Sequence, residues 1–381
     1  MALKQDMIKV FDATAGRAFC RVAGRMAPAV DEAAAPRESP RRVLVIRPGG
    51  IGDAVLVVPM LRAIRDAWPA AELDLLLERR NAGVLRDTGL ADGILLYDRI
   101  LRDLPTAIRR GYDLVIDTEQ YHRLSAVVAW LTRAPRRIGF RTNDRERMFT
   151  ETVPYDQSLY EVHSFLELAS AAIGRPLSWN PEQAFFPVSE QARKFTDRVL
   201  ADLPETTLVA IHPGASIPER RWPTERYARL ARMLADDGIA VVILGGPGDV
   251  RTAAAMSRAI GSFPHANLAG RCSLIQAAAV VSRVSVYVSA DSGVLHLAYG
   301  VGTPTVHLFG PGVLSKWGPP GSRFRSVKNP VPCSPCTRYG YTPPCCQGLV
   351  CMLGIEPATV HAAVREQLES NGPRLAAGAE R

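Results

Sequence analysis

The amino-acid sequence predicts an α/β protein made of two Rossmann-like domains, each with a parallel sheet covered by helices. Short apolar runs alternate with helical segments along most of the chain, which is typical of such sheets. The length of 381 residues suits two or three domains of about 150 residues each. Two segments, VLVIRPGGIGDA and LVAIHPGASIPE, also run an apolar strand into Pro-Gly and a small-residue loop. Because they lie about one domain length apart, the repeat predicts two domains of related architecture.

The composition is that of an ordinary folded protein. Hydrophobic residues make up 47% of the chain and charged residues 22%, which excludes a largely disordered protein. No apolar run approaches the roughly 18 to 20 residues of a membrane-spanning helix, and the N-terminus lacks the features of a secretory signal. We therefore expect a cytoplasmic protein. The 46 basic and 38 acidic residues give a net charge of +8, which indicates an anionic partner or merely reflects a GC-rich genome.

Residues 1–40 are predicted to be an extension and a linker before the first domain. Apolar residues recur there at helical spacing among basic ones, and a linker-like stretch follows. The apolar stripe consists of Ile8, Phe11, Ala15, Phe19, Val22 and Met26. A basic amphipathic helix of this kind either lies on an anionic membrane surface or packs its stripe against the body of the protein. The sequence leaves both alternatives open.

The two domains are expected at residues 41–200 and 205–365. The predicted strands of the first are Val43–Ile46, Leu73–Leu77, Ile94–Tyr97 and Leu114–Asp117. A helix is expected from about Ala54 to Ala67, where Trp68-Pro69 ends it. The predicted strands of the second domain are Leu208–Ile211, Val241–Leu244, Ser285–Ser289 and Thr305–Phe309. Ligands of open α/β sheets bind beyond the carboxyl ends of the strands, so the loops there are the candidate sites.

The loop after the first strand runs from Arg47 to Asp53 and contains three glycines. Glycines let a backbone approach a ligand closely, and the helix that follows offers free N–H groups. The loop matches the dinucleotide-binding fingerprint only weakly, because the third glycine of that pattern is absent. Asp53 is either the N-cap of the helix or a general base aimed into a cleft, and one residue can serve as both.

Two loops of the second domain carry arginine, glycine and acidic residues. His212-Pro213-Gly214-Ala215-Ser216 leads to Arg220 and Arg221, whose guanidinium groups would bind a diphosphate or form only a solvated turn. The helix after this loop is expected to begin at Trp222-Pro223. The loop from Leu244 to Asp249 carries three glycines and an aspartate that accepts hydrogen bonds from a ribose or caps the next helix.

A third loop of the second domain, Asp291-Ser292-Gly293, follows a strand and precedes a helix. Free N–H groups at such a place make a good phosphate site. His296, one turn into that helix, is more often a packed core histidine than a catalyst. The glycine-rich loops and arginines together indicate a cleft for a phosphorylated ligand. The chain has no GxxxxGK[ST] loop, nucleophile elbow or HExxH helix, which excludes P-loop phosphoryl transfer and argues against serine hydrolases and zinc proteases.

Five of the seven cysteines fall in one stretch, PCSPCTRYGYTPPCCQGLVCM. In a reducing compartment such a cluster favours a metal site over disulfides. Four of its thiolates would make a structural site for iron or zinc, and free thiols or labile disulfides are the alternative. The four thiolates expected at this site are Cys333, Cys336, Cys346 and Cys351, and Cys345 could replace either of the last two. Cys20 and Cys272 stand alone and are expected to be inert thiols.

In this order, the loops resemble those of the glycosyltransferase family 9 enzymes, the lipopolysaccharide heptosyltransferases. The similarity runs from about Arg41 to Val360 and is carried by VLVIRPGGIGDAVLVVPMLRAIR, HPGAS…RRWP, LGGPGD and SADSGVLHLA. It implies a GT-B fold, whose two Rossmann-like domains face each other across a cleft, the first holding mainly the acceptor and the second the nucleotide sugar. It also implies an inverting transfer of heptose, typically from ADP-L-glycero-D-manno-heptose, with no metal or other cofactor required for catalysis.

The resemblance also assigns roles to individual residues. Asp53 looks like the general base that deprotonates the acceptor hydroxyl, and Arg220 stands where family members commonly have lysine and would stabilise the diphosphate. The residues implied at the nucleotide sugar are Gly214, Ser216, Arg220, Gly246, Asp249, Asp291, Ser292, Gly293 and His296. Asp249 among them would lie near the ribose, and Asp291, Ser292 and Gly293 would bind the diphosphate. The residues implied at the acceptor are Gly50, Gly52 and Arg141.

The acceptor is harder to predict than the donor. Phosphorylated or carboxylated sugars of a lipid-linked core would suit a cluster of six arginines, which is otherwise a solvated basic stretch. These are Arg133, Arg136, Arg137, Arg141, Arg145 and Arg147. The extension and the pI of about 9.3 fit docking at the inner face of the cytoplasmic membrane, whereas the cysteine segment leaves a protein acceptor open. No nucleic-acid partner is expected. The sequence also leaves open a nucleotide-sugar epimerase of the GT-B fold, a catalytically silent nucleotide-sugar-binding protein, and an NAD-dependent oxidoreductase that uses the loop at Gly50.

Overall fold

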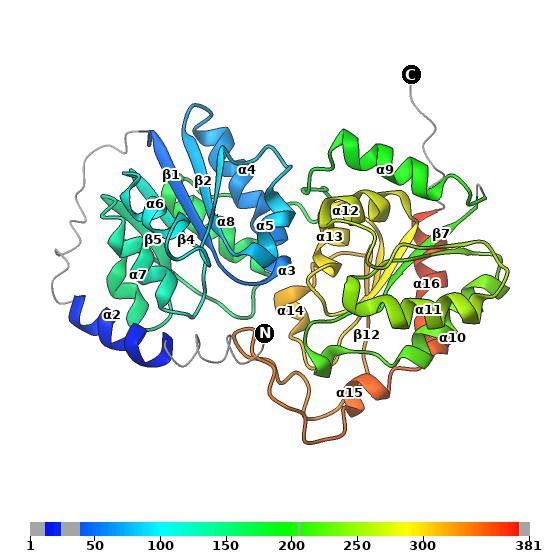
Figure 1. The fold of residues 1–381 in the computed structure, drawn as a ribbon. Helices are drawn as coiled ribbons and strands as arrows, with labels where there is room; N and C mark the ends of the chain where they lie inside the picture. The colour runs from blue at the N-terminus through cyan, green and yellow to red at the C-terminus, as the bar shows by residue number, and fades with distance from the viewer. Residues whose placement is uncertain (1–11, 24–38, 205, 373–381) are drawn as a thin grey trace. The chain divides into compact units, whose positions relative to one another are not determined.

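The computed structural model describes residues 12–23, 39–204 and 206–372. By their internal contacts they form two units, Met1–Trp179 and Asn180–Arg381. Each unit contains a six-stranded parallel sheet with helices on both faces (Figure 1). The predicted fold class, two Rossmann-like α/β domains, is therefore confirmed.

The sheet of the first unit has the strand order β3-β2-β1-β4-β5-β6. Its strands are β1 (Arg42–Arg47), β2 (Glu72–Leu77), β3 (Gly93–Leu96), β4 (Leu114–Asp117), β5 (Arg136–Arg141) and β6 (Glu151–Pro154). The four predicted strands agree with β1 to β4 within about one residue, whereas β5 and β6 were not predicted. The strand order reverses between β1 and β4, which pair in parallel with Ile46 opposite Asp117. Such a switch point opens a crevice at the carboxyl ends of the two strands.

The helices of the first unit cover this sheet and partly differ from the predicted ones. They are α3 (Ile51–Leu56), α4 (Val58–Ala67), α5 (Arg79–Leu85), α6 (Asp103–Arg109), α7 (Leu124–Leu131) and α8 (Glu161–Ile173). A short 3₁₀ helix, η2 (Asp144–Met148), lies between β5 and β6. The single helix expected at 54–67 is divided at Val57, because Pro59 has no N–H to continue the helix but is well suited to the first turn of α4.

The sheet of the second unit has the order β12-β11-β10-β7-β8-β9, which is the same topology as in the first. Its strands are β7 (Leu208–His212), β8 (Ala240–Ile243), β9 (His265–Asn267), β10 (Val286–Ala290), β11 (Thr305–Leu308) and β12 (Phe324–Val327). The four predicted strands agree with β7, β8, β10 and β11, whereas β9 and β12 were not predicted. The switch point lies between β7 and β10, so the sequence repeat reflects a repeat of the fold.

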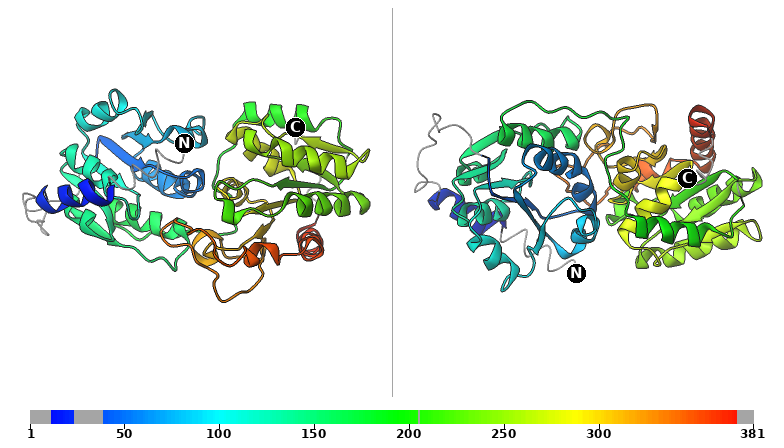
Figure 2. Two further views of the ribbon diagram at one scale, coloured as in Figure 1. Left: turned by 60° about the horizontal axis from the view of Figure 1, so that its bottom comes forward. Right: turned by 90° about the horizontal axis from the view of Figure 1, so that it is seen from above.

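The helices of the second unit pack in pairs, α10 with α11 and α9 with α12 (Figure 1). They are α9 (Glu190–Leu200), α10 (Thr224–Asp236), α11 (Val250–Ile260), α12 (Leu274–Arg283), α13 (Leu295–Gly300), α14 (Leu314–Trp317), α15 (Val350–Leu353) and α16 (Pro357–Asn371). Residues 180–200, assigned to the first domain from the sequence, lie with the second unit. Between β12 and α15 the chain forms a long loop that contains four of the clustered cysteines (Figure 2). We call residues 333–351 the cysteine segment.

The described part of the N-terminal extension packs against the first unit. It consists of η1 (Asp12–Gly16), a π-helical turn, and α2 (Arg17–Ala23). Cys20 is fully buried in a core cluster that includes Leu44 and Val115. The carboxylate of Asp12 accepts hydrogen bonds from the backbone N–H groups of Arg123 and Leu124, at 2.7 and 2.8 Å. For residues 12–23, the structure thus supports the alternative in which the extension packs against the body of the protein.

The face that this extension buries is not the predicted apolar stripe. Asp12, Gly16 and Cys20, spaced four residues apart, are buried, whereas Phe19 is 37% and Val22 62% exposed. Phe19 still contacts Trp130 edge-on, with the ring centroids 5.5 Å apart. Three residues of the stripe, Ile8, Phe11 and Met26, lie outside the described residues. Across residues 12–23, 39–204 and 206–372, every helix is too short or too polar to cross a bilayer.

Candidate active site

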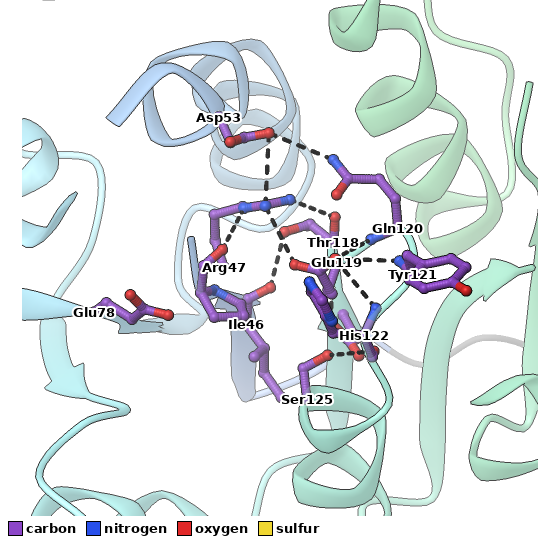
Figure 3. A network of polar contacts seen from close by, with 12 residues as sticks. Ile46, Arg47, Asp53, Glu78, Thr118, Glu119, Gln120, Tyr121, His122 and Ser125 are labelled. Atoms are coloured by element: carbon purple, nitrogen blue, oxygen red, sulfur yellow. Dashed lines mark hydrogen bonds and ion pairs between the residues drawn. The ribbon is translucent and has the colours of Figure 1, made fainter. Parts of the chain in front are cut away.

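The switch point of the first sheet brings a cation and several acidic groups together. Arg47 is the last residue of β1, Asp53 is the third residue of α3, and Glu119 and Gln120 follow β4. Figure 3 shows Arg47, Asp53 and Gln120 pointing toward one another. Nη2 of Arg47 lies 3.6 Å from Oδ1 of Asp53 and 3.5 Å from Oε2 of Glu119. One guanidinium group therefore serves two carboxylates.

Arg47 is held on all sides. Its Nε donates to the carbonyl oxygen of Pro48 at 2.9 Å and its Nη1 to that of Thr118 at 2.7 Å. Burial alone would lower the pKa of this guanidinium, but the charges of Asp53 and Glu119 outweigh burial and raise that pKa. Arg47 consequently stays charged at every physiological pH.

Glu119 is fixed as a carboxylate. Its Oε1 accepts the backbone N–H groups of Gln120, Tyr121 and His122, at 3.1, 3.2 and 3.4 Å (Figure 3). Burial would raise the pKa of Glu119, but the charge of Arg47 and these backbone bonds hold it below its ordinary value. Glu119 is thus an ionised group with little freedom to move.

A further carboxylate, Glu161 at the start of α8, is linked to this network by hydrogen bonds. Its side chain is fully buried and accepts a bond from Nε2 of Gln120 and another from the Tyr155 hydroxyl, at 3.1 Å for Oε2. Nε2 of Gln120 also lies 3.5 Å from Oδ1 of Asp53. Burial, then the charge of Glu161, raises the pKa of Tyr155 far above its ordinary value, so the hydroxyl stays protonated and can donate.

The interpretation of Asp53 as an N-cap is wrong. Gly50 is the N-cap of α3, and the carboxylate of Asp53 instead faces Arg47 and Gln120. The glycines of this loop make room for the pair, because a Cβ at Gly49 would lie 3.1 Å from Nη2 of Arg47 and one at Gly50 only 2.8 Å from Oδ2 of Asp53. Gly49 also has φ +113°, a backbone conformation that favours glycine. Gly52, the third glycine, is buried within α3.

The six arginines predicted as one basic cluster have separate roles. Arg145 is fully buried and binds Asp117 at 2.6 Å, Arg136 binds Glu151 at 2.8 Å, and Arg137 donates to the carbonyl oxygen of Met148. These three hold β4, β5, β6 and η2 together. Arg133, Arg141 and Arg147 are exposed, so these three are the most accessible to an acceptor. Arg141 lies at the end of β5.

In the second unit, the switch point brings an arginine and a buried aspartate together. Arg220, at the end of the 3₁₀ helix η3 (Pro218–Arg220), places Nη1 3.1 Å from Oδ2 of Asp291, which follows β10. Its Nη2 donates to Oγ1 of Thr342 in the cysteine segment at 3.2 Å. The neighbouring Arg221 turns away, is exposed, and donates to the carbonyl oxygen of Ala215. Only Arg220 of the predicted pair therefore points into the site.

Asp291 is tightly enclosed. Its side chain is 3% exposed, and a Cβ at Gly312 would lie 2.1 Å from Oδ2. Burial raises the pKa of Asp291, and the charge of Arg220 offsets only part of that rise. Ser292 and Gly293 follow it and precede α13, whose six residues begin at Leu295. The carboxylate of Asp291 thus holds Arg220.

The remaining predicted donor residues divide into two groups. Oδ2 of Asp249 accepts the N–H of Gly246 at 2.8 Å and lies 3.8 Å from Nε2 of His212. A Cβ at Gly214 would come within 2.4 Å of the same oxygen, so these residues form one compact cluster. Burial lowers the pKa of His212, which is therefore neutral at pH 7. Ser216, by contrast, is exposed.

His296 is placed as a packed core histidine. It is 4% exposed and contacts the rings of Tyr299 and Trp317 edge-on, as expected for a core histidine. Burial, then the charge of Arg220, lowers its pKa to about 3, so the ring is neutral. Its Nδ1 makes no hydrogen bond within the described parts of the chain. This nitrogen is itself buried, so the ring is placed as a core side chain.

The interpretation of the cysteine segment as a metal site is not supported. All seven cysteines are free thiols, and in the part of the chain that the structure describes no three His, Cys, Asp or Glu side chains gather as metal ligands. Burial, then the charge of Cys345, raises the pKa of Cys336 and of Cys351. Cys333, Cys336, Cys346 and Cys351 thus do not form the predicted four-thiolate site. The segment instead packs on the loop after β11, where the N–H groups of Cys336 and Thr337 donate to the carbonyl oxygen of Pro311.

Several residues of the two sites were missed from the sequence. Glu119 and Gln120 had a usable signal, because DTEQ places polar residues directly after a buried strand. Glu161 and Thr342 had none, since both come from elements whose packing the sequence does not reveal. Each makes its contact through tertiary structure alone.

Comparison with known proteins gives a consistent result. The model of glycosyltransferase family 9 (heptosyltransferase) matches residues 101–346, more than half of the chain. Lipopolysaccharide heptosyltransferase 2 of Escherichia coli K12 is 26% identical over 288 residues, 71% of this chain and 83% of that protein. Lipopolysaccharide heptosyltransferase 1 of Pseudomonas aeruginosa PAO1 is 25% identical over 329 residues, 78% of this chain and 86% of that protein.

Solved structures share the fold. E. coli ADP-heptose lps heptosyltransferase II superimposes with a TM-score of 0.67 at 24% identity, covering 86% of this chain and 99% of that one. E. coli heptosyltransferase WaaC with ADP gives a TM-score of 0.63 at 19% identity, covering 88% and 99%. Both comparisons support the GT-B arrangement of two parallel-sheet domains implied by the sequence.

Proposed function

Because this chain belongs to glycosyltransferase family 9, and is therefore a glycosyltransferase enzyme, we propose that it transfers heptose from ADP-heptose to a saccharide of the lipopolysaccharide core. The observation that best supports this is the carboxylate of Asp53 at the switch point of the first sheet. Its side chain is 17% exposed, whereas those of Arg47 and Glu119 beside it are 3% and 8% exposed. A held but accessible carboxylate is what a general base requires.

The proposed reaction is an inverting displacement. Asp53 takes the proton of an acceptor hydroxyl, whose oxygen attacks the anomeric carbon of the heptose. A new C–O bond forms on one face while the bond to the diphosphate breaks on the other, and ADP leaves with the electron pair. No metal or other cofactor takes part, because Arg220 and the backbone N–H groups of Ser292 and Gly293 stabilise the charge that develops on the diphosphate.

The proposed donor site is that of the second unit. The guanidinium of Arg220 suits a nucleotide diphosphate, and the neutral ring of His296 adds no further charge. Asp249 would accept hydrogen bonds from the ribose, with Gly214, Gly246 and Ser216 lining the approach. E. coli heptosyltransferase WaaC has been solved with ADP and with ADP-2-deoxy-2-fluoro heptose, which supports this choice of donor.

The proposed acceptor site lies at the carboxyl ends of the strands of the first sheet, around Gly50, Gly52 and Arg141. A lipid-linked acceptor places the enzyme at a membrane surface, and we extend the proposal to peripheral contact with anionic lipid. The exposed Phe19 and Val22 of α2, beside Arg17 and Arg21, are the residues suited to that contact.

The test compares the wild type with Asp53→Asn, using ADP-heptose and lipopolysaccharide that lacks its core heptoses. Loss of the base is expected to reduce kcat by about 10²- to 10⁴-fold. Thermal-shift measurements with ADP, UDP, GDP and NAD identify the nucleotide, and stabilisation by ADP is expected. Unchanged turnover of Asp53→Asn would reject this base. Conversion of the donor sugar in the absence of an acceptor would indicate an epimerase. Stabilisation of the protein by NAD alone would indicate an oxidoreductase.

A further inference from the structure

Two carboxylates share one nitrogen of a buried guanidinium beside the proposed base. Nη2 of Arg47 lies 3.6 Å from Asp53 and 3.5 Å from Glu119, whereas Nε and Nη1 are occupied by backbone carbonyl oxygens. The backbone bonds are sufficient to join β1 to the loop after β4. The contact of Nη2 with Asp53 is not needed for that connection, so it indicates another role for Arg47.

We propose that Arg47 and Glu119 are positioning residues for Asp53: Arg47 fixes the orientation of its carboxylate, and Glu119 remains as the counter-ion of Arg47 when Asp53 takes up the acceptor proton. This inference rests on the proposed function, in which Asp53 is the general base. It goes beyond that function because neither Arg47 nor Glu119 has been assigned a part in the reaction.

The charge balance of the proton transfer explains why two carboxylates are present. Before transfer, the positive Arg47 faces a negative Asp53 and a negative Glu119. After transfer, Asp53 is neutral, and Arg47 and Glu119 remain as a matched pair. If Asp53 were the sole counter-ion, its protonation would leave a guanidinium that is 3% exposed without compensation, which is costly in a protein interior. Glu119 removes that cost.

The two carboxylates, Glu119 and Asp53, differ in how firmly they are held. Glu119 accepts three backbone N–H groups through Oε1, and its Oε2 lies beside Arg47. These contacts hold the Glu119 carboxylate in place. Asp53 is the more exposed of the two carboxylates. Gly49 and Gly50 leave space for Arg47 and Asp53, because a Cβ at either glycine would crowd the side chain beside it. The loop is therefore built around the pair.

The other groups around Asp53 keep this balance. From α8, Glu161 faces the network, but Gln120 and the protonated hydroxyl of Tyr155 donate to it. From α5, the neutral Asn81 donates to the carbonyl oxygen of Arg47. His122 acts on the far side, where its charge favours the ionised form of Glu119. The carboxylates that act on Arg47 are thus Asp53, Glu119, Glu161 and, from the end of β4, Asp117.

The decisive experiment is the pH dependence of kcat for Glu119→Gln, with ADP-heptose and lipopolysaccharide lacking core heptoses. This substitution removes a negative charge near Asp53 and leaves Asp53 as the main counter-ion of Arg47. Both effects oppose proton uptake, so the acid limb of the profile should move to lower pH by about one unit. The plateau should fall by up to about 10-fold, because a base weaker by about one pKa unit loses at most that factor.

A second variant tests positioning in case Glu119→Gln does not fold. Arg47→Lys keeps the charge but cannot serve two carbonyl oxygens and two carboxylates at once. It should lower kcat by about 10- to 100-fold, with an unchanged KM for ADP-heptose and an acid limb near that of the wild type. Glu151→Gln is the matched control, since it breaks an arginine–carboxylate pair of the same unit at the edge strand β6.

The outcomes distinguish this inference from the function on which it rests. If Asp53→Asn is inactive while folded Glu119→Gln and Arg47→Lys keep the wild-type plateau and acid limb, the inference is overturned and the proposed base stands. If Asp53→Asn retains full turnover, the proposed base itself fails. A shift of the acid limb in Glu119→Gln but not in Glu151→Gln supports the inference.

Discussion

Replacing Gly50 with alanine tests whether the position of the Asp53 carboxylate matters for turnover. The backbone of Gly50, with φ −73° and ψ 159°, is open to any residue, so Gly50→Ala introduces no backbone strain. Its new Cβ would lie 2.8 Å from Oδ2 of Asp53, whereas ordinary contacts begin at 3.4 Å. The flexible carboxylate should therefore move by about 0.6 Å, the difference between these distances, while the fold stays intact.

The expected effect on the rate is larger than the effect on stability. A displacement of about 1 Å of a reacting group costs up to about 10²-fold in rate, so kcat should fall by about 10- to 100-fold. Alanine is a poorer N-cap than glycine, which costs about 1 kcal/mol of the free energy of unfolding at most. Steady-state transfer from ADP-heptose and thermal unfolding measure the two effects separately.

Gly83 provides the control for this experiment. It lies within α5, and a Cβ there would meet no atom within 4 Å. Gly83→Ala should leave kcat unchanged and slightly stabilise the helix. If Gly50→Ala is folded and turns over as fast as Gly83→Ala, the exact position of Asp53 is irrelevant and the reasoning is refuted.

Three further predictions concern other parts of the molecule. Thr342→Val removes the hydrogen bond to Arg220 and should raise the KM for ADP-heptose by about 5- to 10-fold, whereas Thr342→Ser should restore it; equal values for both would reject a role of Thr342 in the donor site. His307 is buried, and burial lowers its pKa from 6.5 to about 3. Because the unfolded state takes up this proton first as the pH falls below 6.5, His307 should cost about 2 kcal/mol of stability at pH 5. His307→Asn should therefore flatten the fall of Tm between about pH 7 and about pH 5, and an unchanged slope would contradict this. Asp12→Ala removes the acceptor of two N–H groups at the start of α7 and should lower the free energy of unfolding by about 1 to 2 kcal/mol in urea titrations, whereas no change would mean that the extension does not stabilise the first unit.

The sequence predicted the inner strands of both sheets because they are continuous apolar runs. The strands that it did not reveal have other compositions. β5 reads RRIGFR, and its first two arginines are satisfied by Glu151 and by carbonyl oxygens, partners that only the fold supplies. β9 has three residues, too few for a periodic pattern. Polar or very short strands thus depend on tertiary contacts that no local pattern records.

The residues of the candidate sites were predictable where a charged side chain comes soon after the end of a strand. Asp53, Arg220 and Asp291 lie shortly after the carboxyl ends of β1, β7 and β10, and the rule for open sheets finds them. Their partners could not be predicted in the same way. Glu119 is 72 residues from Arg47, and Thr342 is 122 residues from Arg220. Which of several polar residues completes such a pair depends on register and packing.

The repeated Pro-Gly loop shows how one architecture carries two chemistries. In both units a basic side chain ends the first strand and approaches a carboxylate, Arg47 to Asp53 at 3.6 Å and His212 to Asp249 at 3.8 Å. Arg47 is always charged, whereas burial lowers the pKa of His212 and leaves it neutral at pH 7. The first loop therefore keeps a fixed positive charge that orients a carboxylate.

In the second unit the positive charge comes instead from Arg220, which lies outside the strand and is held by Asp291 and Thr342. A positive charge fixed at a strand end suits the removal of a proton from an acceptor, because it orders the base. An arginine carried on a loop suits a diphosphate, because its guanidinium can bind two phosphate oxygens at once. The two switch points are thus equivalent in topology, and each holds one arginine against a carboxylate.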